Sequence, residues 1–141
     1  MAIWQCTVQL VNQDFEQTEK DPVFNTVNSN SIQRLDGFLS KGSSWSNALH
    51  IYGDIDSTCV ILGMESGKTE EVSIRFDLRT LTKDILDGLW QFIKSNDAKL
   101  LSNGQVFDGT YQNLINILKN SKANLFCNNP IGFLESIKEE S

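Results

Sequence analysis

Five residues near the middle of the chain, Asp54-Ile-Asp-Ser-Thr58, have the types and spacing of a phosphate-transfer site. In enzymes with this DxDxT signature, the first aspartate attacks phosphorus and the second acts as general acid and base. That chemistry needs the first aspartate at the end of a buried parallel strand, whereas residues 49–53 are only half apolar and Cys59 opens another strand. A turn between two strands, in which Asp and Ser bond their own backbone, explains the same letters. A small phosphatase-like hydrolase using Asp54 and Asp56 is therefore our alternative hypothesis.

Two further patterns imitate ligand sites, and each lacks a required part. The same aspartates, with Thr58 and Glu65, match ligand positions of a calcium loop, but Cys59 stands where that loop needs glycine. Residues 63–69 imitate a phosphate-binding loop, but their glycines are too close together and a strand is expected after them. We therefore expect no bound metal and no cofactor.

Histidine and cysteine offer no complete set for nucleophilic catalysis. His50 is the only histidine, and we expect it on a strand surface. The three cysteines, Cys6, Cys59 and Cys127, are widely spaced and odd in number, which argues against a disulfide framework. Cys6 and Cys59 lie in apolar strands and should be buried thiols, whereas Cys127 is either a thiolate near a helix start or a buried residue.

The segment 70–79 alternates apolar and charged residues, which is the period of a strand with one buried face. Its outward face would carry Glu71, Arg75, Asp77 and Arg79. One interpretation is a solvated row of ion pairs with cross-strand neighbours such as Glu65 or Asp56. A second is a recognition face with Trp45 and Tyr52 as aromatic anchors, and a third is buried pairing beneath the helices. The tentative binding residues are Trp45, Tyr52, Asp54, Asp56, Glu71, Arg75, Asp77 and Arg79.

Charge and composition limit the classes of partner. The chain has 141 residues, 40% of them hydrophobic, and a net charge of −6. Residues 1–70 hold four Lys or Arg against nine Asp or Glu, so most of the acidic excess lies in the first half. Such a surface repels phosphate backbones and attracts basic proteins, so we expect a protein partner and no nucleic acid.

Length and hydropathy favour a single domain covering residues 1–141. The longest uninterrupted apolar stretch, Cys59 to Met64, is far shorter than the roughly 20 residues of a membrane-spanning helix. The first residues also lack the pattern of a secretory signal. We therefore expect a cytoplasmic protein that does not bind a membrane; the oligomeric state stays open.

The hydrophobic periodicity predicts an α+β fold: an antiparallel sheet of four to six strands, with a meander at its core and three to four helices mainly on one face. Strands are expected at 3–11, 49–52, 58–64 and 71–78, with the third lying centrally, and a short extended piece is possible at 23–27. A hairpin turning at Asn103-Gly104 is also expected. Helices should follow the caps Ser31, Thr82, Thr110 and Asn129. Gly88 either weakens its helix or admits a close neighbour.

Three segments together carry a family resemblance: Trp45 followed by Tyr52-Gly-Asp-Ile-Asp56, the strand 70–79, and residues 121–134. They resemble a group of small bacterial α+β proteins, some of which are similar to the immunity proteins that accompany polymorphic toxins. The resemblance implies a protein without catalytic residues that binds and neutralises a cognate toxin. The acidic excess of the chain would suit a basic toxin, such as a nuclease. A self-associating structural module is a further alternative to this leading hypothesis.

Overall fold

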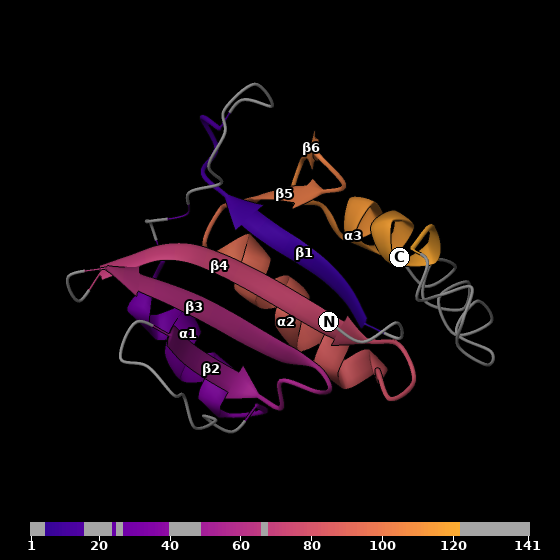
Figure 1. Ribbon diagram of the computed structural model, residues 1–141, viewed down its shortest axis with the longest axis horizontal. Helices are drawn as coiled ribbons and strands as arrows, with labels where there is room; N and C mark the ends of the chain where they lie inside the picture. Colours follow the sequence, from indigo (N-terminus) through magenta and orange to yellow (C-terminus); the bar gives the residue numbers. More distant parts are fainter. Residues whose placement is uncertain (1–4, 16–23, 25–26, 40–48, 66–67, 122–141) are drawn as a thin grey trace.

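The computed structural model describes residues 5–15, 24, 27–39, 49–65 and 68–121. These residues form one antiparallel sheet of six strands in the order β2-β3-β4-β1-β5-β6 (Figure 1). The strands are β1 (Gln5–Val11), β2 (Leu49–Gly53), β3 (Cys59–Glu65), β4 (Lys68–Asp77), β5 (Lys99–Ser102) and β6 (Gln105–Phe107). The meander β2-β3-β4 is confirmed. However, β3 is not central in the whole sheet, because β4 and β1 occupy the middle.

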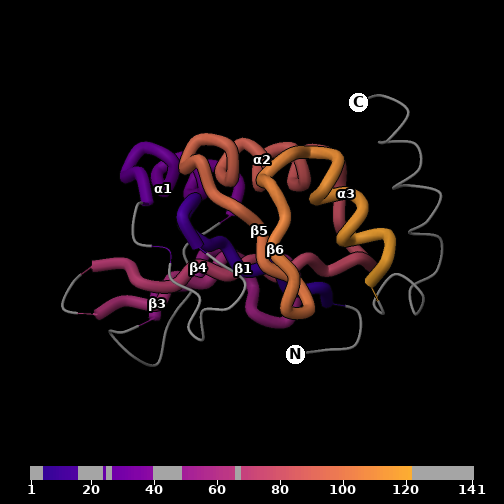
Figure 2. The backbone as a smooth tube through the Cα atoms, turned by 90° about the horizontal axis from the view of Figure 1, so that it is seen from above, coloured from indigo at the N-terminus to yellow at the C-terminus, as the bar shows by residue number. Residues whose placement is uncertain are grey.

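Three helices are described: α1 (Ser29–Asp36), α2 (Lys83–Ser95) and α3 (Tyr111–Lys119). They lie on the same side of the sheet, with α3 next to the β5–β6 hairpin (Figure 2). The expected α+β architecture is therefore confirmed. The helix predicted to begin at Asn129 lies outside the described residues. None of the described helices is long and apolar enough to cross a membrane.

The period-two pattern of β1 and β4 builds the core between sheet and helices. The register pairs Cys6 with Phe76, Val8 with Ile74 and Leu10 with Val72, so their side chains share one face of the sheet. All of them are buried, together with the inward residues of α2 and α3. The buried residues of the two helices are Leu86, Leu89, Phe92, Ile93, Leu114, Ile115, Ile117 and Leu118.

Two predictions in the less regular parts of the chain have clear outcomes. The hairpin turn is confirmed, because Asn103 and Gly104 both have positive φ (50° and 76°) and join β5 to β6. Of the possible extended piece at 23–27, only Phe24 and Val27 are described. The backbone N–H of Phe24 donates to the Glu70 carbonyl at 2.8 Å, so this residue lies against the start of β4.

The first helix begins three residues earlier than its sequence predicts. Its N-cap is Asn28, whose side chain accepts from the Asn30 backbone N–H at 2.8 Å. Ser31, the predicted cap, is instead buried inside the helix and accepts a hydrogen bond from Asn96 Nδ2 at 2.9 Å. Asn96 Oδ1 also accepts from the backbone N–H of Asn28 at 2.6 Å. A buried amide at the end of α2 therefore fixes the start of α1, a long-range contact that the local pattern could not reveal.

Gly88 allows α2 to meet the residue that follows α1 closely. A Cβ atom added to Gly88 would come within 2.8 Å of Phe38 Cζ and 3.0 Å of both Cε atoms. Phe38 keeps 37% of its surface exposed, so the ring lies across the glycine rather than inside the core. The prediction that Gly88 admits a close neighbour is therefore confirmed.

This contact predicts opposite effects for one substitution in two backgrounds. Alanine at position 88 favours the helix by about 1 kcal/mol over glycine, but in the wild type it must displace the Phe38 ring. We expect Gly88→Ala to be neutral or destabilising alone and to stabilise by about 0.5–1 kcal/mol in a Phe38→Ala background. Urea denaturation of the four proteins measures the difference. Equal effects in both backgrounds would show that the ring does not occupy this space, and Gln91→Ala should show no coupling to Phe38→Ala.

Candidate functional site

Most of the predicted binding residues converge where β4 ends, β1 begins and the β2–β3 turn folds over both. Asp77, the last residue of β4, has 0% exposed surface. It pairs across the sheet with Gln5, the first residue of β1, which is also buried. The expectation that Asp77 faces a partner is therefore wrong. Its side chain lies on the face away from the helices, so the alternative of burial beneath the helices is wrong as well.

The Asp77 carboxylate is satisfied by two nearby residues. Arg79 Nε donates to Oδ1 at 3.1 Å and Arg79 Nη2 donates to Oδ2 at 3.0 Å, while the Arg79 backbone N–H also reaches Oδ1. Ser57 Oγ donates to Oδ2 at 3.1 Å. Burial by itself would raise the pKa of Asp77, but the hydrogen bonds from Arg79 and Ser57 and the Arg79 charge lower the pKa overall. The carboxylate is held ionised at neutral pH.

Side chains of β1 and β4 hold the β2–β3 turn in place. Gln5 Nε2 donates to the carbonyls of Ile55 and Ser57 at 3.0 and 2.6 Å. Arg75 Nη1 reaches the same Ile55 carbonyl at 3.4 Å. Thr58 Oγ1 accepts from the Asp77 backbone N–H at 3.0 Å. The serine and threonine of the DxDxT segment are thus structural partners of Asp77.

The two aspartates of that segment lack the arrangement that a phosphatase needs. Asp54 Oδ1 accepts from the Asp56 backbone N–H at 2.9 Å, which is the local turn that the sequence offered as the simpler explanation. The flanking strands are antiparallel neighbours, so Asp54 does not end a parallel strand. Among the described residues, no group of three or more His, Cys, Asp or Glu could hold a metal ion.

The other predicted site residues differ in burial and in position. Tyr52 is 7% exposed and pairs with Val60 on the helix-covered face, so its assignment as an exposed anchor is wrong.

Arg79 follows the end of β4 in a turn, and its side chain is 46% exposed. Arg75 is half-buried opposite Cys59, and Glu65 lies opposite Lys68, so the pairing of Glu65 with the arginine row is not formed. Trp45 lies outside the described residues.

An acidic cluster that the sequence only partly indicated lies near the β3–β4 connection. Glu65, Glu70 and Glu71 are all exposed there. A side-chain hydrogen bond with Glu65, then partial desolvation and the charges of Glu65 and Glu71, raise the pKa of Glu70 above 4.5. Like charges are therefore crowded at this end of the sheet, and a cation placed among them would relieve the repulsion.

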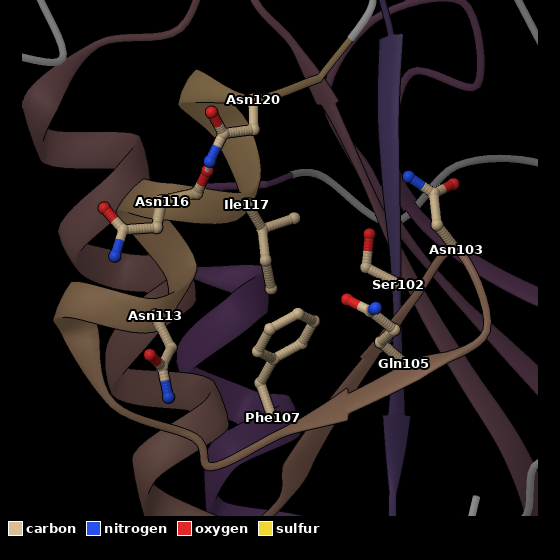
Figure 3. A pocket seen from close by; sticks show the side chains of 8 residues that line it. All are labelled: Ser102, Asn103, Gln105, Phe107, Asn113, Asn116, Ile117 and Asn120. Carbon is tan, nitrogen blue, oxygen red and sulfur yellow. Dashed lines mark hydrogen bonds between the residues drawn. The ribbon is translucent and has the colours of Figure 1, made fainter.

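A second site, missed at the sequence level, lies between the β5–β6 hairpin and α3 (Figure 3). It is a pocket of about 300 Å³. The described residues that line it are Ser102, Asn103, Gln105, Phe107, Asn113, Asn116, Ile117 and Asn120. The only advance signal was the density of Asn and Gln between positions 103 and 120, which identifies no family of sites.

Comparison with protein-family models, with curated proteins and with solved structures found no match to this chain.

The Asp77 network predicts a specific loss of stability in acid. Because the pKa of Asp77 is lowered in the folded state, its contribution is complete above the ordinary value of 3.8 and is lost as pH falls through the lowered value. Asp77→Asn should cost about 1–3 kcal/mol at neutral pH and should flatten the stability profile at the acid end. Urea denaturation from neutral pH down to about pH 2 measures both effects. If the stability of the variant and of the wild type fell equally in acid, this role of Asp77 would be contradicted. The control is Asp14→Asn, which removes an exposed carboxylate outside the network.

The acidic cluster predicts the opposite pH dependence. Since the pKa of Glu70 is raised in the folded state, ionised Glu70 destabilises the folded protein above that pKa, and this destabilisation disappears as pH falls through it. Glu70→Gln should therefore raise Tm at neutral pH, with no gain once the pH is well below 4.5. Thermal unfolding followed by circular dichroism measures this. Asp84→Asn removes the same charge from the first turn of α2, where an acid is favourable, and should lower Tm instead.

Proposed function

We propose that this chain is a binding protein of the immunity type, which holds and neutralises a basic protein partner through the acidic cluster where β3 and β4 connect. One observation carries the proposal. Glu65, Glu70 and Glu71 lie close together on exposed strand residues, where a hydrogen bond with Glu65, partial desolvation and the charges of Glu65 and Glu71 disfavour the ionised form of Glu70. A Lys or Arg cluster on a partner would convert that repulsion into attraction.

A second acidic group, Asp54 and Asp56, precedes β3, at the end of that strand opposite to Glu65. Asp54 and Asp56 are exposed, and the turn that carries them is fixed by the hydrogen bonds from Gln5 and Arg75. The seven residues of β3 separate the two acidic groups by about 20 Å of strand. That span suits the contact patch of a protein better than a small ion.

The sheet face between the acidic groups suits a partner with a flat surface. On β1, β4 and β3 it presents half-buried side chains, including Thr7, Gln9, Ser73 and Ile61. None of the described helices lies on this side (Figure 2). Strands hold such side chains rigidly, so docking would order little that is not ordered already.

The structural features weigh differently on the two alternatives. A hydrolase using Asp54 and Asp56 would need these residues at the end of a parallel strand, whereas they lie in an antiparallel turn. Self-association through the acidic cluster would place like charges opposite each other, which is unfavourable. The family resemblance to immunity proteins and the net charge of −6 both favour a basic partner.

Binding to a neighbouring gene product tests the proposal. We would co-express the chain with any adjacent gene that encodes a basic domain, purify the complex, and measure association by interferometry at low and high salt. The triple variant Glu65→Gln, Glu70→Gln, Glu71→Gln should slow association at least about tenfold at low salt, and the difference should shrink as salt rises. Inhibition of the partner's toxicity should weaken in parallel.

A control with equal charge separates local recognition from net charge. Asp14, Asp36 and Asp108 are exposed acids outside the cluster, and the corresponding triple Asn variant removes the same three charges. It should associate at nearly the wild-type rate. Equal slowing by both variants, or failure of the wild type to bind the basic neighbour, would count against the acidic cluster as the binding site.

A further inference from the structure

We propose that the pocket between the β5–β6 hairpin and α3 binds a single uncharged sugar ring. This inference is independent of the acidic cluster and concerns the β6 edge of the sheet (Figure 1). The pocket volume of about 300 Å³ is at the lower end of the range for small-molecule sites, roughly 300–1,000 Å³. It therefore suits one ring rather than a long chain.

The lining determines the charge of the ligand. All eight described lining residues are uncharged: one Ser, one Gln, four Asn, one Phe and one Ile. A charged ligand entering this pocket would lose hydration without meeting an opposite charge from these residues. A neutral ligand carries no such penalty, so phosphorylated and carboxylated compounds are disfavoured.

The polar groups of the lining match hydroxyl groups. The side chains of Ser102, Asn103 and Gln105 make no hydrogen bond within the described structure, so their donors and acceptors remain for a ligand. On the α3 side, Asn113 Nδ2 is used by the Asp108 carbonyl and Asn120 Nδ2 by the Asn116 carbonyl, which leaves both Oδ1 atoms as acceptors. A sugar hydroxyl both donates and accepts, so one ring can use both sides of the pocket.

The centre of the pocket is apolar. Phe107 and Ile117 lie between the hairpin side chains and those of α3 (Figure 3). A pyranose ring has one face of C–H groups, which carry a partial positive charge and pack on the negative face of an aromatic ring. A central aromatic ring bordered by free amides thus fits both the C–H face and the hydroxyl rim of one sugar.

Both walls of the pocket are held rigid. The Asn103-Gly104 turn has the two positive φ angles of a tight hairpin, and Thr110 caps α3 by accepting from the Asn113 backbone N–H at 3.1 Å. Little conformational entropy is then lost when a ligand binds, which raises affinity for a small molecule.

Nuclear magnetic resonance titration of the full chain tests the inference. Glucose, galactose, mannose and N-acetylglucosamine would each be added to the ¹⁵N-labelled protein up to tens of millimolar. For at least one sugar we expect saturable shifts confined to 102–107 and 113–120, including the side-chain NH₂ signals of Asn103 and Gln105. Gln105→Ala should weaken that sugar about tenfold, as the loss of one or two hydrogen bonds requires. Phe107→Leu, a second variant, should weaken it by removing the aromatic face.

A matched control and three outcomes decide the result. Gln91→Ala removes an exposed amide from α2, outside the pocket, and should leave the sugar affinity unchanged. Tighter binding of glucose 6-phosphate than of glucose would overturn the neutral assignment. Shifts of the same residues by blocked trialanine but by none of the sugars would assign the pocket to peptides. No saturable shift with any of the four sugars would also overturn the proposal.

Discussion

The structure depends on one buried charge at the end of the central strands. A carboxylate with no exposed surface is tolerated only when its oxygens are fully hydrogen-bonded, and Asp77 obtains those bonds from Arg79 and Ser57. Ser57 lies twenty residues earlier in the chain, in the β2–β3 turn. Satisfying the charge therefore requires this turn to close over the ends of β1 and β4.

This requirement decides which acidic groups reach the surface. Ser57 and Thr58 face the Asp77 region, and the Gln5 amide holds the turn from the β1 side. Asp54 and Asp56 are exposed on the same turn. A segment that imitates a catalytic motif thus holds the β2–β3 turn against Asp77 through Ser57 and Thr58. Its two carboxylates, Asp54 and Asp56, are exposed on the surface and do not form a reaction centre.

The sequence predicts the fold where the signals are local. The apolar run of β3, the alternation of β4, the Asn103-Gly104 turn, and the caps Thr82 and Thr110 all depend on residues close in sequence. It does not predict that β1 inserts between β4 and β5, because strand pairing at long range leaves no local mark. For the same reason the burial of Tyr52 was missed, and burial of Asp77 was considered only beneath the helices: each burial depends on partners brought by distant segments. The pocket residues come from two elements, and neither shows a motif alone.

The strand order also keeps the two proposed surfaces independent. The acidic cluster lies on β3 and β4, whereas the amide pocket adjoins β6, and β4 is three strand spacings from β6. Three spacings amount to about 14 Å, more than the screening length of about 8 Å at physiological ionic strength. Charge at one surface therefore has little direct effect on the other. Two parts of the structure connect these surfaces: β1, the only strand that bonds both β4 and β5 within the described sheet, and the core that β4 and β5 share with α2 and α3.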